Sequence, residues 1–206
     1  MFSYADYLTW EEGRWELIDG TPVAMSPAPS RQHQDISIRL SVLLFAHFQD
    51  KECHVYAAPF DVRLPAEAGA ADEHITTVVQ PDISVICDPN KLDDRGCLGA
   101  PDLIVEILSP ASAAHDSKIK RDLYEKHGVR EYWLVHPGDR LLMAYVLDEH
   151  GQYGKAAIFS GEDTVHSAAF SEFAFVATDL FARGTPDPSP PVCTLTKRTQ
   201  KTLLQQ

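Results

Sequence analysis

The sequence predicts one α/β domain built on a mixed β-sheet, and two observations carry this prediction. The segments 82–87 and 103–108 are short and apolar on both alternating faces, as buried strands are, and a helical segment and another apolar strand follow them. Segments with hairpin patterns flank this middle region on both sides. The middle region thus has the order strand, strand, helix, strand, with antiparallel hairpins before and after it. This order implies a mixed sheet that carries helices.

Length and composition agree with one domain. The chain has 206 residues, 44% of them hydrophobic, which suits a single domain with a real core. No apolar run approaches a membrane span, and the N-terminus lacks the basic and apolar segments of a secretion signal, so we expect a cytoplasmic protein. Residues 1–183 are predicted to form the domain. A Pro-rich stretch opens residues 184–206, which we expect to be a flexible tail.

Charge and cysteine content limit the choice of function. The formal net charge of −12 repels nucleic acid overall, whereas DNA-binding proteins usually have a basic face. A local groove can differ from the whole chain, and carboxylates that bind metal also count as negative. The four cysteines are scattered without CxxC spacing, so we expect ordinary reduced cysteines and no zinc ribbon.

The elements of the first half follow from caps and turns. Ser3 can cap a short helix to Leu8, and strands at 15–18 and 21–25 flank Asp19-Gly20, a strong hairpin signal. Ser30 can cap a long helix to about residue 48, because apolar residues recur there at helical spacing. Residues 55–64 alternate in polarity and predict one strand.

The second half holds the apolar strands 82–87 and 103–108, separated by a turn-rich stretch. A helix is predicted at 117–127, ended by Gly128, which suits a left-handed helix stop. Residues 131–136 predict a buried strand, and 141–147 with 153–159 predict a hairpin.

Two acidic residues occupy positions where apolar residues are expected. Glu106 lies inside the run from Leu103 to Leu108, and an unpaired buried carboxylate would cost several kcal/mol, so it needs a cation, a hydrogen-bond donor or a pocket. Asp82 opens the other apolar strand directly after Pro81. Taken singly, a sheet-end salt bridge for Glu106 and a turn or cap for Asp82 are competing interpretations. Together, two acids on neighbouring core strands suit a hard cation such as Mg²⁺.

Three more residues are candidates for the same site. Lys120 flanks the predicted core stripe of Ile119, Leu123 and Tyr124, so it can be aimed inward, although an isolated lysine of this kind usually reaches solvent. Glu16, on the first hairpin strand, could approach the site or be an exposed edge-strand residue. For His33 we favour a place in the helix–sheet interface over a place in the site.

These motifs occur in the order of a known family. The chain closely resembles the Uma-type family, whose members are called putative restriction endonucleases, within the PD-(D/E)XK nuclease superfamily. The resemblance covers roughly residues 4–181 and is most specific from 101 to 135. It is carried by these segments and residues: Trp15-Glu16-Leu17-Ile18-Asp19-Gly20, Met25-Ser26-Pro27, His33, Gln80-Pro81-Asp82, residues 101–112, Asp116, Lys120, Tyr124 and residues 128–135.

The resemblance implies a restriction-endonuclease-like core that hydrolyses phosphodiester bonds. It implies that Asp82, Glu106 and the Ile107 carbonyl hold Mg²⁺ or Mn²⁺, with Glu16 as an accessory acid. The lysine of the motif has moved from the strand, where Leu108 stands, to the following helix as Lys120. The implied partner is nucleic acid, with DNA as the expected form, and no membrane is involved. Many nucleases of this superfamily act as dimers, so a homodimer is expected by analogy.

A local excess of positive charge fits a phosphate-binding surface. Residues 115–130 hold two more positive than negative side chains. The alternative, from a different class, is a catalytically silent nuclease fold used as a binding or regulatory module. The acidic composition favours it, whereas the retention of Asp82, Glu106 and Lys120 argues against it. Glycosidase chemistry from paired carboxylates lacks any supporting signature.

Overall fold

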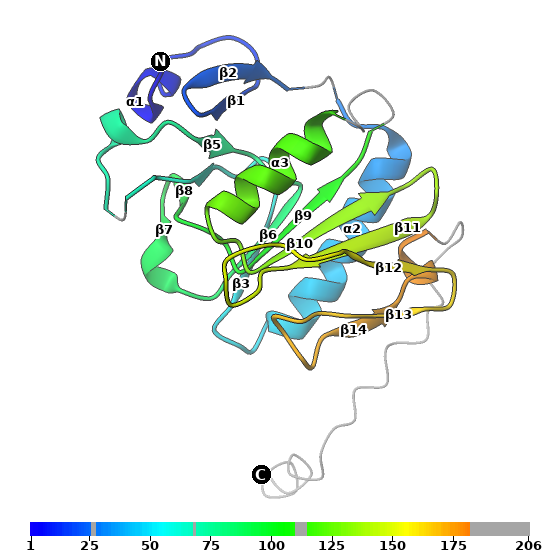
Figure 1. Ribbon diagram of the computed structural model, residues 1–206. Helices are drawn as coiled ribbons and strands as arrows, with labels where there is room; N and C mark the ends of the chain where they lie inside the picture. The colour runs from blue at the N-terminus through cyan, green and yellow to red at the C-terminus, as the bar shows by residue number, and fades with distance from the viewer. Residues whose placement is uncertain (26–27, 68, 110–114, 182–206) are drawn as a thin grey trace, which may run out of the picture.

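The computed structural model describes residues 1–25, 28–67, 69–109 and 115–181. A mixed sheet lies at its centre, and short strands from the first half of the chain form a second sheet at one end (Figure 1). The predicted tail, residues 184–206, lies outside the described residues. No helix in the described ranges is long and apolar enough to cross a membrane.

The central sheet has the strand order β12-β11-β10-β9-β6-β3. Strands β9 and β10 are parallel, and every other neighbouring pair is antiparallel, as the prediction of a mixed sheet requires. The parallel pair is joined through a crossover that contains helix α3 (His115–Lys126). The bounds are β3 (His54–Ala57), β6 (Ile83–Ile86), β9 (Leu103–Ile107), β10 (Glu131–His136), β11 (Leu141–Val146) and β12 (Ala157–Ser160).

Two smaller sheets complete the fold. The second sheet has the order β2-β1-β5-β4-β8-β7, and β13 pairs with β14 alone. Their bounds are β1 (Trp15–Ile18), β2 (Thr21–Ala24), β4 (Val62–Arg63), β5 (Val78–Val79), β7 (Leu92–Asp93), β8 (Gly96–Leu98), β13 (Thr164–His166) and β14 (Ala174–Val176). Short helices are α1 (Tyr4–Tyr7), α4 (Thr178–Phe181) and the 3₁₀ turns η1 (Asp72–His74) and η2 (Pro89–Lys91).

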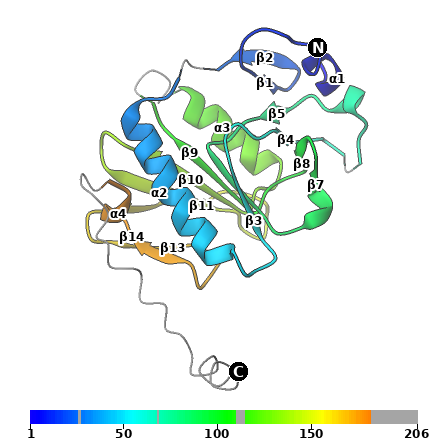
Figure 2. The same ribbon diagram turned by 180° about the vertical axis from the view of Figure 1, so that it is seen from behind.

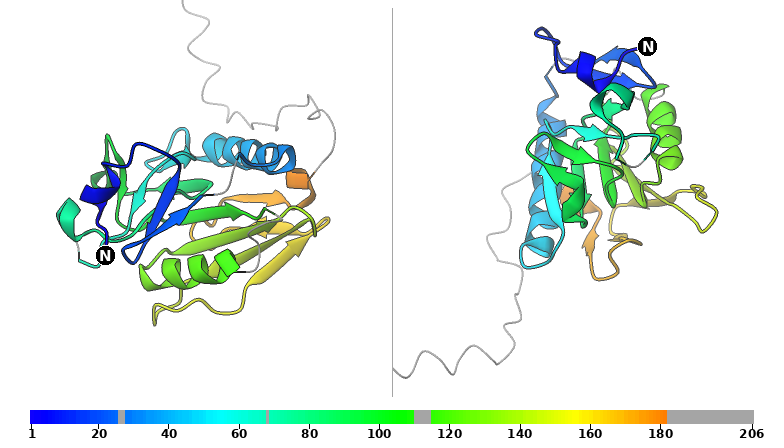
Figure 3. Two further views of the ribbon diagram at one scale, coloured as in Figure 1. Left: turned by 90° about the horizontal axis from the view of Figure 1, so that it is seen from above. Right: turned by 90° about the vertical axis from the view of Figure 1, so that its left-hand side faces the viewer.

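The two long helices, α2 (Arg31–Phe48) and α3 (His115–Lys126), lie on opposite faces of the central sheet (Figures 2 and 3). Side chains alternate between the faces along each strand. Leu103, Val105 and Ile107 join the core beneath α2, whereas Ile104 joins the core that contains Leu123 of α3. Glu106 therefore faces α3.

Several predicted elements are present with the expected limits. The Ser30 hydroxyl caps α2 by accepting a hydrogen bond from the backbone N–H of His33, and the helix begins at Arg31. Asp19 and Gly20 both have positive φ in the β1–β2 hairpin, and Gly128 ends α3 with φ of 80°. The prediction of one strand at 55–64 was wrong. Pro59 has no N–H for a ladder, and β3 and β4 lie in different sheets on either side of it.

The cysteine prediction also needs correction. Cys53 and Cys87 form a disulfide between positions that flank the antiparallel pair β3–β6. Cys97 is a buried free thiol, and Cys193 lies outside the described residues. The sequence could not indicate this bond because 34 residues separate the two cysteines and only the strand register brings them together.

Glu131, at the start of β10, is fully buried and joins the sheet to the segment that precedes β14. Its carboxylate accepts hydrogen bonds from the Trp133 indole N–H at 2.7 Å and the Ser167 hydroxyl at 2.6 Å. The backbone N–H groups of Ala168 and Ala169 donate to it as well. Four donors satisfy this buried acid, so it anchors the segment rather than forming a reactive site.

We expect Glu131→Ala to lower the free energy of unfolding by about 3 kcal/mol or more, because the four donors would stay buried without partners. The exposed Glu149→Ala should change it by less than about 0.5 kcal/mol. Urea denaturation measures both. Equal stability of the two variants would contradict the structural role of Glu131.

Candidate active site

Strand register brings the two predicted acids together. In the antiparallel pair β6–β9, Ile83 lies opposite Val105, so the next pair places Asp82 opposite Glu106 at the end of the ladder. Side chains at opposite positions have Cβ atoms about 4.5–5.5 Å apart and share one face. The backbone ladder ends here, where the Ile107 N–H donates to the Asp82 carboxylate instead of to a backbone carbonyl. Two carboxylates therefore lie at the same end of the β6–β9 pair, with Glu106 facing α3.

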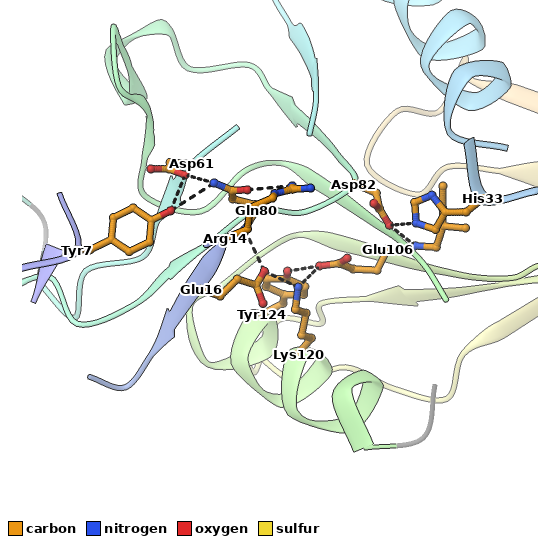
Figure 4. Close-up of polar contacts among 11 residues, drawn as sticks. Tyr7, Arg14, Glu16, His33, Asp61, Gln80, Asp82, Glu106, Lys120 and Tyr124 are labelled. Carbon is orange, nitrogen blue, oxygen red and sulfur yellow. Dashed lines mark hydrogen bonds and ion pairs between the residues drawn. The ribbon is translucent and has the colours of Figure 1, made fainter. Parts of the chain in front are cut away.

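Lys120 joins two of the acids. From the second turn of α3, its Nζ donates to Glu106 Oε1 at 2.9 Å and to Glu16 Oε1 at 2.7 Å (Figure 4). One turn later, the Tyr124 hydroxyl donates to the same Glu106 oxygen at 2.6 Å. All four side chains are largely or fully buried, so one ammonium offsets two carboxylates with little help from water.

Contacts from β9 and α2 hold the Asp82 side chain. Its Oδ2 accepts from the backbone N–H of Ile107 at 2.7 Å and lies 3.1 Å from His33 Nε2 in the first turn of α2. His33 is buried, which agrees with the favoured interface position, but its ring also contacts a predicted site residue. The structure thus adds His33 to the group around Asp82.

A polar network extends from Glu16 toward the N-terminal sheet. The backbone N–H of Gln80 donates to Glu16 Oε1 at 3.0 Å, and its side-chain amide donates to Asp61 at 2.8 Å. Arg14 and Tyr7 contact the Gln80 amide from either side (Figure 4). Gln80 precedes Pro81 and Asp82, so the network fixes the segment that carries Asp82.

Burial and neighbouring charge control protonation in the cluster. Burial raises the pKa of Glu106 to about 7; Lys120 opposes this effect, and the negative charges of Asp82 and Glu16 add to it. Burial alone would lower the pKa of Lys120, but Glu106 and Glu16 outweigh it, so the pKa is raised and the lysine stays charged. For His33, burial lowers the pKa, and the contact with Asp82 more than compensates.

The donors present fit a hard divalent cation. Asp82 and Glu106 supply oxygens at the same end of the β6–β9 pair, and Mg²⁺ characteristically takes one or two carboxylates and retains waters. Burial is the main cause of the raised pKa of Glu106, and the negative charge of Asp82 adds to it; a cation between the two acids would relieve this repulsion. Within the described residues, no three His, Cys, Asp or Glu side chains form a metal-binding group, so the fit is to a two-carboxylate site.

The structure brings together Asp82, Glu106, Lys120 and Glu16, with Ile107 beside them. Glu16 is buried on β1, which has neighbours on both sides, so it is not an exposed edge residue. The predicted core stripe was wrong at Ile119, which is 38% exposed; Leu123 and Tyr124 are buried. Tyr124 was predicted only as a core residue and Gln80 without a role, and their long-range contacts place both against the acids of the site.

The predicted positive excess of residues 115–130 does not form a free phosphate-binding surface. Arg121 pairs with Asp122 and Glu125, and Lys126 pairs with Asp19. Arg130 pairs with Asp102 at the opposite end of the β9–β10 strands, and Lys120 lies inside the site. Nearby carboxylates thus neutralise most of these side chains.

This fold and this group of residues define a restriction-endonuclease-like α/β protein. The chain belongs to the Uma2 family, whose model, described as "Putative restriction endonuclease", matches residues 4–179. The resemblance found in the sequence is therefore confirmed.

Two known proteins are similar to the chain. "Uncharacterized protein slr1290" of Synechocystis sp. is 30% identical over 133 residues, which are 63% of this chain and 65% of that protein. The matched region thus spans less than two thirds of that relative. A crystal structure described as "a putative nuclease belonging to DUF820" from Anabaena variabilis has a TM-score of 0.67 at 21% identity. It covers 88% of this chain and 98% of that one, and it supports the fold.

Charge substitutions should move the titration of Glu106 in opposite directions. Lys120→Met removes the cation that lowers the pKa of Glu106, so we expect this pKa to rise above its value of about 7. Asp82→Asn removes a repelling charge, so we expect it to fall. Carbon NMR of labelled glutamate across a pH series measures the change, with the exposed Lys118→Met as control. An unmoved Glu106 titration in both variants would contradict the described electrostatics.

Proposed function

We propose that the protein is a metal-dependent endonuclease that hydrolyses phosphodiester bonds, with DNA as its substrate. The observation that supports this most directly is the pair of opposed carboxylates, Asp82 and Glu106, with the Lys120 ammonium 2.9 Å from Glu106. Membership of the family described as "Putative restriction endonuclease" supports the same conclusion. The acids, the lysine and the family together favour phosphodiester chemistry over other uses of paired carboxylates.

Asp82, Glu106 and the Ile107 carbonyl would hold Mg²⁺ or Mn²⁺. When bound, such an ion lowers the pKa of a coordinated water and neutralises charge on the phosphate. The Ile107 N–H and His33 fix the Asp82 carboxylate, and the Tyr124 hydroxyl fixes Glu106, so both acids are oriented before substrate arrives.

Lys120 would orient the attacking water and stabilise the negative charge that develops on the phosphoryl oxygens. Its raised pKa rules against a role as general base at neutral pH, because the ammonium keeps its proton. Glu16 holds the ammonium from the side away from Glu106 and so acts as a positioning residue.

The alternative is a silent nuclease-fold module that binds without cleaving. Purified protein incubated with plasmid DNA, single-stranded DNA and RNA, each with Mg²⁺, Mn²⁺ or a chelator, separates the two functions. Metal-dependent cleavage supports the endonuclease. Intact substrates under all conditions, in a protein that binds no metal, would overturn it.

We expect Asp82→Asn and Glu106→Gln to reduce plasmid cleavage at least ~10³-fold, because each removes a metal-binding charge. Lys120→Ala should reduce it about 10²–10³-fold, the usual loss for one electrostatic donor. Lys118→Ala, two residues away on the exposed side of α3, should leave the rate within about twofold. Circular dichroism checks folding. Full activity in Asp82→Asn would contradict the proposed site.

Mg²⁺ or Mn²⁺ affinity should depend on pH through Glu106. Its pKa of about 7 in the metal-free protein means that binding below pH 7 must displace a proton, so affinity should fall about tenfold per unit as pH decreases. Above pH 7 affinity should level off. Tyr124→Phe removes a hydrogen bond that lowers this pKa, so the break should move to higher pH. Calorimetry measures both; a flat profile would contradict the role of Glu106.

A further inference from the structure

Helix α2 carries a row of apolar side chains that point away from the core. Ile38, Val42 and Phe45 follow one another at i, i+4 and i+7, so they share one face of the helix. They are 61%, 60% and 61% exposed. The opposite face of α2 supplies the core side chains Ile36, Leu40, Leu44 and Phe48. We call the exposed row of Ile38, Val42 and Phe45 the α2 stripe.

The α2 stripe has the character of a contact surface. Single exposed apolar side chains are common, whereas a continuous row of them marks an interaction site. A surface helix ordinarily carries charges on its outward face, but no Asp, Glu, Lys or Arg occurs between Arg39 and Asp50. In Figure 2, α2 lies in front of the sheet, and no described helix or strand crosses over it. The described parts of the chain therefore leave the stripe uncovered.

We propose that the α2 stripe packs against the same stripe of a second copy of the chain, with the two helices antiparallel about a two-fold axis. Such an interface uses one surface twice, so that surface must be complementary to itself. The stripe meets this condition. Reversal about the point midway between Ser41 and Val42 exchanges Ile38 with Phe45. Each copy then places its isoleucine against the phenylalanine ring of the other.

Polar and charged residues extend the same symmetry beyond the stripe. Gln34 mirrors Gln49, and Arg31 at the start of α2 mirrors Glu52 beyond its end. Arg31 is 83% exposed and pairs with Asp35 of its own helix, which engages only part of the five N–H donors of a guanidinium. Glu52 is exposed, and no hydrogen bond or ion pair joins it to the residues that the structure describes. Antiparallel pairing brings this acid toward the arginine of the other copy, whereas parallel pairing would set arginine against arginine.

The size of this surface fits a reversible dimer. Helix α2 has 18 residues and is about 27 Å long, so paired helices bury an area of the small class, below about 1,200 Å². Pairing also leaves the candidate active site open, because the stripe points away from one side of the sheet and Glu106 faces α3 on the other (Figure 3). Dimerisation is thus independent of whether the protein cleaves nucleic acid.

Charge substitutions at the two ends of the stripe test this pairing in the full chain. Ile38→Arg and Phe45→Glu each place a charge against an apolar side chain of the second copy. Arginine and glutamate are better helix formers than the residues they replace, so α2 should stay folded, which circular dichroism checks. Ile158→Arg is the matched control, because Ile158 on β12 is also 60% exposed. Sedimentation equilibrium from about 1 to 200 µM measures the dissociation constant.

We expect a wild-type dissociation constant in the micromolar range. Each stripe variant should raise it at least ~30-fold, the usual effect of losing a central contact residue, and Ile158→Arg should change it less than about twofold. A wild-type chain that stays monomeric throughout would overturn the inference and leave residues 182–206 or a different protein as the occupant of the stripe. Stripe variants that dimerise as well as the wild type would overturn it too, because the contact would then lie elsewhere.

Mixing the variants tests the antiparallel arrangement. An equimolar mixture of Ile38→Arg and Phe45→Glu should form a heterodimer, because the arginine of one variant meets the glutamate of the other and one native Ile38–Phe45 contact remains. A fluorescent label on the Phe45→Glu chain follows its association. Ile158→Arg adds the same positive charge and should not recruit the labelled chain. Failure of the two stripe variants to associate would overturn the antiparallel pairing.

Discussion

The repulsion between Asp82 and Glu106 is the constraint around which this end of the fold is organised. Like charges at opposite positions of an antiparallel ladder destabilise a sheet, and burial makes the effect larger. Contacts from two helices and from β9 itself offset it: Lys120 with Tyr124 from α3, His33 from α2, and the Ile107 N–H of β9. The two long helices and the sheet therefore meet where the acids meet.

Much of the central sheet could be predicted because its signals are local. A carboxylate inside Leu103–Ile107 contradicts the apolar pattern of a buried strand, and this conflict alone marks Glu106 as unusual. Caps and turn residues fixed the limits of α2 and the first hairpin for the same reason. The direction of Lys120 also follows from helix phase, although Ile119 of the expected stripe is partly exposed.

The remaining features depend on which strands become neighbours. His33 lies 49 residues from Asp82 in the chain, and the Cys53–Cys87 bond requires the β3–β6 register. The short strands β5, β7 and β8 carry too few residues for a periodic pattern. The prediction of a phosphate-binding surface at residues 115–130 failed for a similar reason. Acids distant in sequence, such as Asp19 and Asp102, pair with basic residues of that segment.

Because Lys120 lies on a helix rather than on a strand, the site depends on how stably α3 packs on the sheet. A lysine on a strand would remain beside the acids for as long as the sheet persists. Lys120 instead moves away from the acids whenever α3 detaches from the sheet. The packing of α3 on the sheet relies on buried residues such as Leu123 and Tyr124. Any transient opening of this helix would separate the ammonium from Glu106 and restore the repulsion within the strand pair. Opening would thus be costly, and the same charges that suit the site for chemistry also hold its covering helix closed.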